Sequence, residues 1–262
     1  MSSVTPAAGE PASHEISLTG GDHSRRTLSH FFEAHAERGT PGDLFEKEAK
    51  RVLRIDVDGD VWLQPGAAIA YRGNLRFERL PTLKARSIRS AVLREITPLA
   101  RATGAGRLYC SRHGWHVEVI TLDGETLFVS WEELLAFETS LRFEMHLVPH
   151  GVGLFAGGLI VVKLEGHGAL GVVVHGEPLC LPVSPVQPLA TDPHCTLAWT
   201  GGLTPTLKTD LGWRSLFRHG GKEPFQMHFD GTGWVVVQPH EDPSRFKLGL
   251  HPLKRIRKLI GV

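Results

Sequence analysis

The sequence predicts an all-β protein built from three repeated β-units, with one or two short helices. From Arg51 onward, short runs rich in Val, Ile, Leu and Phe are separated by Gly, Pro, Asp and Asn. Their intervals are near the roughly 8 to 12 residues typical of all-β folds. A Gly-x-Gly followed by an apolar run also occurs three times, beginning at Gly104, Gly166 and Gly231, with offsets of 62 and 65 residues.

Composition limits the class of protein. The chain has 262 residues, 41% of them hydrophobic, which is enough to bury a sizeable core. The 29 basic and 28 acidic residues give a net charge of +1, so a uniformly basic nucleic-acid-binding surface is not expected. Cys110, Cys180 and Cys195 have no C-x-x-C spacing, which indicates neither a disulfide framework nor a thiolate zinc site. We expect Cys110 in the core and the protein in a reducing cytoplasm.

Residues 1–45 are expected to form a flexible tail with one short helix. Residues 1–20 lack the pattern of a secretory signal, and the chain shows no Arg-rich mitochondrial presequence. Residues 27–38 place Leu28, Phe31 and Phe32 near one face at helical spacing. This amphipathic helix either docks on its own core or binds a groove on a partner.

The first β-unit is expected to begin with hairpins, because apolar runs alternate there with turn-forming pairs. The order predicted is strand 51–57, turn Asp58-Gly59, strand 61–63, turn Pro65-Gly66, strand 67–71, turn Gly73-Asn74 and strand 75–77.

The repeated glycines are expected to be structural. A Gly-x-Gly that binds phosphate needs a following helix whose free amide groups face the anion, whereas strands are expected after these. Positive-φ turns or close backbone approach explain such glycines better. The glycines assigned to structural turns are Gly66, Gly73, Gly104, Gly106, Gly166, Gly168, Gly231 and Gly233.

Four stretches carry a resemblance to a known family. They are residues 50–57 with 61–66 and 70–73, residues 153–155 with 164–168, residues 188–193, and residues 225–239. The first and last are also similar to each other, since Asp58-Gly-Asp-Val-Trp-Leu-Gln-Pro65 parallels Asp230-Gly-Thr-Gly-Trp-Val-Val-Val-Gln-Pro239. In this order and spacing, the stretches resemble the AIM24 family, whose members have a fold like that of the trp RNA-binding attenuation protein (TRAP).

The resemblance implies three β-sandwich units related to the double-stranded β-helix, in a flat, often trimeric or pseudo-symmetric assembly. It places the AIM24-like β domain at residues 46–245, between the tail of residues 1–45 and a basic amphipathic tail at 246–262. Family members have no established catalytic residues, and the mitochondrial relatives are associated with inner-membrane organisation. The resemblance therefore implies a scaffold and no reaction.

Histidines and nucleophiles give only a weak case for catalysis. His113, His116 and Glu118 form the best metal-binding candidate, because cupins, which are related to the double-stranded β-helix, bind metals through His-x-His and a nearby Glu. However, positions 113 and 116 fall on opposite faces of a regular strand. No Gly-x-Ser-x-Gly nucleophile motif occurs in the sequence. We therefore expect a non-enzymatic protein without a cofactor, and the alternative is a divergent cupin-like metalloenzyme.

Basic residues are concentrated in two segments. Residues 72–101 contain eight Arg or Lys against two Glu, and residues 82–95 are expected to form a helical insertion. The C-terminal segment alternates basic and apolar side chains. Both segments are candidates for binding an anionic partner, or for solvated surface and subunit contacts. The residues assigned to anionic-partner binding are Lys84, Arg86, Arg89, Arg94, Lys254, Arg255, Arg257 and Lys258.

The leading functional hypothesis is a cytoplasmic homo-oligomer, with a trimer favoured. It would act as a β scaffold that presents its basic segments to an anionic membrane surface or a macromolecule. The alternative, by analogy with TRAP, is the binding of RNA or a small ligand at the seams between repeats.

Overall fold

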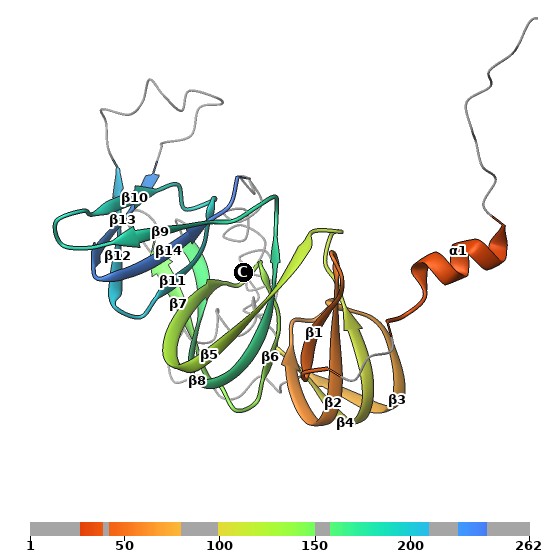
Figure 1. Ribbon diagram of the computed structural model, residues 1–262. Helices are drawn as coiled ribbons and strands as arrows, with labels where there is room; N and C mark the ends of the chain where they lie inside the picture. Colours follow the sequence, from red (N-terminus) through yellow and green to blue (C-terminus); the bar gives the residue numbers. More distant parts are fainter. Residues whose placement is uncertain (1–26, 39–41, 80–98, 150–157, 210–224, 240–262) are drawn as a thin grey trace, which may run out of the picture. The chain divides into compact units, whose positions relative to one another are not determined.

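The computed structural model of the chain describes residues 27–38, 42–79, 99–149, 158–209 and 225–239 (Figure 1). The chain divides into a unit of residues 1–39 and a unit of residues 40–262, and each is described by itself. The described residues include no helix that is long and apolar enough to span a membrane.

The described part of the first unit contains one helix, α1 (Leu28–His35). The hydroxyl of Thr27 caps the helix by accepting a hydrogen bond from the His30 N–H at 3.3 Å. In the last turn, His35 Nδ1 lies 2.9 Å from the Phe31 carbonyl oxygen, and the two rings stack with centroids 4.6 Å apart. The short helix predicted within residues 27–38 is confirmed. Whether it docks on its own core or binds a groove on a partner stays a prediction.

The described part of the second unit contains fourteen strands, which confirms the all-β fold class. The strands are β1 (Phe45–Ala49), β2 (Val52–Leu63), β3 (Ala68–Arg79), β4 (Ala100–Cys110), β5 (His116–Ser130), β6 (Leu134–Glu138), β7 (Arg142–Pro149), β8 (Gly158–Val174), β9 (Leu179–Val183), β10 (Leu189–Thr191), β11 (Thr196–Thr200), β12 (Leu203–Thr209), β13 (Phe225–Gly231) and β14 (Gly233–Val237).

Eleven strands form one sheet, and its order is β3-β4-β2-β6-β8-β5-β11-β14-β9, with β1 beside β2 and β7 beside β8. The remaining three form a second sheet in the order β10-β13-β12. The strand pairings are antiparallel, so neighbouring strands need no long crossover helix between them.

Long strands in this unit pass through glycines in unusual backbone conformations. Gly59 lies opposite Gly104 in the β2–β4 pair, and Gly73 lies opposite Gly106 in the β3–β4 pair. The φ angles of Gly59, Gly73 and Gly104 are +112°, +93° and +124°, a region that residues with a Cβ rarely adopt. A Cβ on Gly104 would also collide with the carbonyl oxygen of Asn74, so only glycine fits there.

These pairings correct two of the predicted turns. Asp58-Gly59 lies inside β2 and Gly73-Asn74 lies inside β3, because each strand bends at its glycine while the hydrogen-bonded ladder continues. For the same reason, four other assigned turn glycines lie within strands: Gly104 and Gly106 in β4, and Gly166 and Gly168 in β8.

Two predicted turns are confirmed. Pro65-Gly66 forms the turn between β2 and β3, and Gly66 has a φ of +88°. Gly231 ends β13 and Gly233 begins β14, with a bend at the residue between them.

Three clusters of buried side chains form the core of the described strands. The first surrounds Ile55 and Leu108, the second surrounds Phe137, and the third surrounds Trp199 and Phe229. The core therefore divides into three parts, and each part draws residues from strands that are distant in the sequence. The internal threefold repeat and its TRAP-like detail stay predictions.

Cys110 belongs to the first of these clusters, as expected from the sequence. The side chain is completely buried, and this burial raises the pKa of its thiol to about 12. Cys180 is exposed, and none of the three cysteines forms a disulfide.

One arginine is completely buried and surrounded by carboxylates. Arg54 Nη1 donates a hydrogen bond to Glu48 Oε2 at 2.9 Å, and Nη2 pairs with Glu46. The Nε atom lies 3.5 Å from Asp56 Oδ2. A guanidinium that is buried away from solvent requires such partners, because burying an uncompensated charge is costly.

Two buried glutamines hold the turn at residues 131–133. Gln64 Nε2 donates to the Trp131 carbonyl oxygen at 2.9 Å, and Gln238 Nε2 donates to Glu133 Oε1 at 3.1 Å. These glutamines occupy matching places in the two similar stretches that end at Pro65 and Pro239. The similarity in sequence is thus accompanied by a similar structural role.

Candidate functional site

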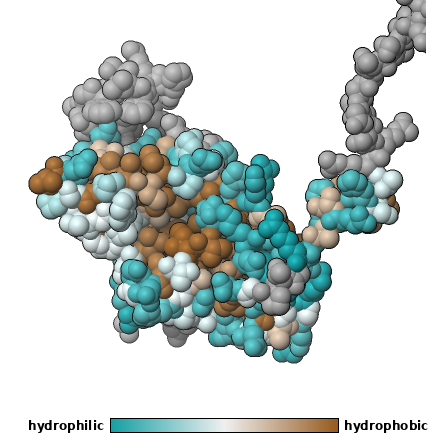
Figure 2. All heavy atoms as spheres, viewed as in Figure 1, coloured by the Kyte–Doolittle hydropathy of each residue, from teal (hydrophilic) through white to brown (hydrophobic). Residues whose placement is uncertain are grey.

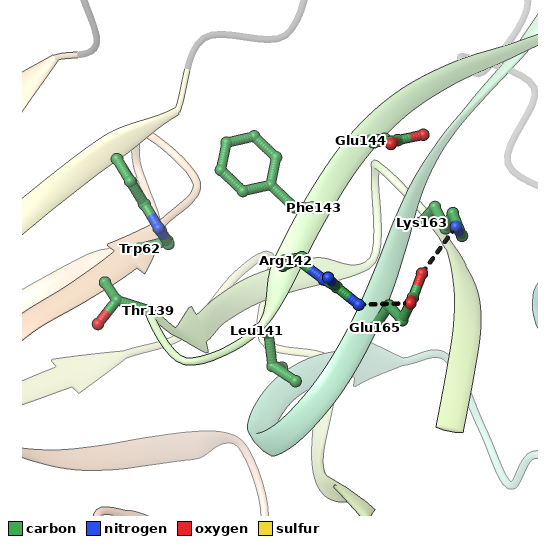
Figure 3. Close-up of a pocket in the computed structure, with 8 residues that line it drawn as sticks. All are labelled: Trp62, Thr139, Leu141, Arg142, Phe143, Glu144, Lys163 and Glu165. Carbon is green, nitrogen blue, oxygen red and sulfur yellow. Dashed lines mark hydrogen bonds and ion pairs between the residues drawn. The ribbon is translucent and has the colours of Figure 1, made fainter. Parts of the chain in front are cut away.

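A hollow in the described residues lies where β2 faces β7 and β8 (Figure 3). Its volume is about 610 Å³, within the range of small-molecule sites. The lining comes from β2, the connection after β6, β7 and β8, and consists of Trp62, Thr139, Leu141, Arg142, Phe143, Glu144, Lys163 and Glu165.

One wall of the hollow is aromatic. The rings of Trp62 and Phe143 meet edge to face with centroids 5.6 Å apart, and Phe143 contacts Phe137 in the same way at 5.5 Å. The guanidinium of Arg101 lies 5.5 Å from the Trp62 ring and forms an ion pair with Asp60. Trp62 is therefore held between the core and a fixed cation.

The other wall consists of charges paired across two strands. Arg142 lies opposite Glu165, and Glu144 lies opposite Lys163 in the β7–β8 register. Glu165 accepts hydrogen bonds from Arg142 Nη2 at 2.7 Å and from Lys163 Nζ at 2.8 Å (Figure 3). Opposite charges in facing positions stabilise the strand pair.

These contacts shift the pKa values of Glu165 and Lys163 in the charged wall. The hydrogen bond from Lys163, followed by the positive charges of Lys163 and Arg142, lowers the pKa of Glu165. The same hydrogen bond raises the pKa of Lys163. Both groups therefore stay charged near neutral pH. With two cations and two anions, the wall carries no net charge, and the hollow suits a neutral or zwitterionic ligand with an apolar part.

The structure does not bring the candidate metal ligands together. His113 lies in the turn between β4 and β5 with a φ of +50°, whereas a strand was predicted there, and its ring contacts Trp115. His116 begins β5, and the Glu118 carboxylate is bound by Lys47 Nζ at 2.9 Å. Among the described residues, no group of three His, Cys, Asp or Glu side chains is placed to hold a metal ion.

The basic candidates for partner binding all lie outside the described residues. They are Lys84, Arg86, Arg89, Arg94, Lys254, Arg255, Arg257 and Lys258. The helical insertion predicted for residues 82–95 lies outside as well.

The hollow at Trp62 was not predicted from the sequence. The available signal was the pair of alternating stretches Arg142-Phe-Glu144 and Lys163-Leu-Glu165, in which opposite charges flank an apolar residue. Their alignment across two strands depends on the register of β7 and β8, which the local pattern does not specify.

Comparison with known proteins now defines the class of this all-β protein. The family model described as "Mitochondrial biogenesis AIM24" matches residues 45–240, which is most of the chain. The chain belongs to the AIM24 family, and the resemblance seen in the sequence is confirmed.

A solved structure shares the fold. The crystal structure of the Streptococcus pyogenes protein SPYM3_0169 is similar with a TM-score of 0.58 at 18% sequence identity. The similarity covers 82% of this chain and 97% of that protein. No curated protein matches the chain.

Proposed function

We propose that the protein is a non-enzymatic, homo-oligomeric β scaffold, assembled as a trimer in the cytoplasm, that presents basic segments to an anionic membrane surface or macromolecule. The observation that carries the proposal is how the basic insertion is attached. Arg79 at the end of β3 pairs with Ala100 at the start of β4. The segment with Lys84, Arg86, Arg89 and Arg94 therefore leaves and re-enters the sheet at one place.

The strand that leads into this segment adds to its positive charge. Arg72, Arg76 and Arg79 on β3 are exposed, against the single acidic residue Glu78. The basic residues of β3 and of the segment between β3 and β4 are concentrated in one part of the sequence. They create a local positive field even though the net charge of the chain is only +1. The matched roles of Gln64 and Gln238 support the repeated framework on which these basic residues are placed.

Binding to vesicles and to RNA tests the proposal and identifies the partner. The full-length chain is mixed with phosphatidylcholine vesicles with and without phosphatidylserine, and separately with labelled single-stranded RNA. We expect binding to one anionic partner that weakens with salt. Arg86→Ala with Arg89→Ala should weaken it by about fivefold per charge removed.

The matched control is Lys50→Ala with Arg51→Ala, two exposed basic residues in the turn between β1 and β2. This pair removes the same charge at a different place and should leave binding within about twofold of the unmodified protein. Equal losses for both double variants would show that overall charge, and not the insertion, governs binding.

A second candidate function is small-ligand binding in the hollow at Trp62. It is favoured by the combination of an aromatic wall with a wall of neutralised charge pairs. Titration with neutral aromatic compounds, followed by tryptophan fluorescence, tests it. Saturable quenching that disappears in Trp62→Leu but persists in Trp234→Leu would support the site, and identical quenching in both variants would exclude it.

A further inference from the structure

Exposed apolar side chains in the described strands gather at the two ends of the large sheet. Large exposed hydrophobic residues of the second unit occur in β3 at one end of the strand order, and in β9, β14 and the connection after β9 at the other. They are Ile69, Tyr71, Phe77, Leu179, Val186 and Trp234. Among the residues whose exposure the structure describes, the other edge strands β1, β7, β10 and β12 contribute no such residue.

The β3 end is a protruding aromatic surface. β3 pairs with β4 alone among the described strands, so one of its edges is open. The rings of Tyr71 and Phe77 are 5.2 Å apart, although six residues in a straight strand span about 20 Å. The bend at Gly73 brings the two rings together, and Tyr71 is 56% exposed.

The β9 end is an apolar surface with a hollow beside it. Leu179 is 57% exposed and shares a face of the sheet with Leu181 and Val237, whereas Trp234, 52% exposed, lies on the opposite face. Figure 2 shows hydrophobic residues over β9 and β14. A hollow of about 340 Å³ is lined by Leu179 and Leu181 of β9, by Val237 of β14 and by residues around β10. Its volume is ample for an aromatic side chain.

The two ends carry opposite charges. The exposed residues of β3 include Arg72 and Arg76 on either side of the bend. The acidic residues Glu177 and Asp192 line the hollow at the β9 end, where β9 and β14 contain no charged residue. Asp192 Oδ1 also accepts a hydrogen bond from the His194 N–H at 2.8 Å. Like ends facing each other would oppose equal charges, whereas unlike ends would pair arginine with carboxylate.

We propose that the β3 end of one copy of this chain binds the β9–β14 end of the next, so that Tyr71 and Phe77 cover the hollow beside Leu179. The contact rests on the proposed oligomeric function and names its interface. It is head to tail, and such contacts close into rings when the rotation between subunits allows. Pro182 removes one backbone donor from β9, so side chains carry the contact.

Complementation between two surface variants tests this contact. Tyr71→Glu damages the β3 end, and Leu179→Glu damages the β9 end; both positions are exposed, so the fold should be kept, as circular dichroism will verify. The masses of the full-length variants are measured by sedimentation velocity over a range of concentrations. Each variant alone should be monomeric, with self-association weakened at least about tenfold.

An equimolar mixture of the two variants should form a one-to-one dimer, because one intact β3 end and one intact β9 end remain. Lys50→Glu, an exposed charge change elsewhere, should assemble like the unmodified chain. A mixture that stays monomeric, or variants that assemble normally, would overturn the head-to-tail contact while the oligomeric scaffold stands. An unmodified chain that is monomeric at all concentrations would overturn both.

Discussion

Replacing Arg54 by methionine should destabilise the β unit strongly. The methionine fills much of the same space, so the loss comes chiefly from charge and hydrogen bonds. Glu48, whose side chain is 11% exposed, would then keep a carboxylate near the protein interior without the guanidinium that now binds it. Breaking a buried pair in this way costs about 3 to 5 kcal/mol.

The partners of Arg54 can be separated by their exposure. Glu46 and Asp56 are 34% and 30% exposed, so water compensates them better than Glu48. Glu48→Gln keeps an acceptor for Arg54 Nη1 and leaves the other two carboxylates in place. It should cost only about 1 kcal/mol, the difference between a charged and a neutral hydrogen bond.

Urea unfolding followed by tryptophan fluorescence measures both variants. The double variant Arg54→Met with Glu48→Met should recover part of the loss, because an apolar pair leaves no buried charge between these positions. An Arg54→Met protein with the stability of the unmodified chain would refute the reasoning, since the carboxylates would then not depend on the guanidinium.

Three further predictions concern other positions in the β strands and their connections. Gly104→Ala should prevent folding or cost more than about 3 kcal/mol in thermal unfolding, because its Cβ would collide with the Asn74 carbonyl oxygen. Gly59→Ala, which has open space around its Cβ, should cost only about 1 to 3 kcal/mol of backbone strain. Equal losses for the two variants would contradict the collision at Gly104. Gln64→Leu should lower stability by about 1 to 3 kcal/mol in urea, because the carbonyl that it binds loses its donor; an unchanged midpoint would exclude this role. Native Cys110 should resist a thiol reagent at pH 8 while Cys180 reacts, and rapid modification of all three thiols would show that the core is open. Because burial raises the pKa of Cys110 from 9.0 to about 12, its contribution to the free energy of unfolding should be complete below pH 9.0 and should be lost as the pH rises toward 12.

The sequence was sufficient for the fold class and the family but not for the path of the long strands. Pro65-Gly66 behaves as a turn, and Asp58-Gly59 does not, although both have ordinary turn chemistry. The difference is non-local, since Gly59 faces Gly104 across the β2–β4 pair. Glycine serves turns and strand bends equally well, so the local pattern cannot distinguish them.

The sequence pattern also did not reveal which single polar residues are buried. Arg54 alternates with the apolar Leu53 and Ile55, and alternation alone places it on a solvent face. The structure covers that face with carboxylates from β1. The hollow at Trp62 likewise combines elements distant in the chain. Such sites depend on strand order, which hydrophobic periodicity does not encode.

The mass of the assembly in solution tests the central claim most directly. Light scattering on the full-length chain, and on a chain ending before His251, is carried out at low and high salt. The account predicts three times the 28.8 kDa chain mass for the full-length protein and a trimer for the shortened chain, which places assembly in the β unit. A monomer for both chains in every buffer would contradict the scaffold and leave a stand-alone ligand-binding protein.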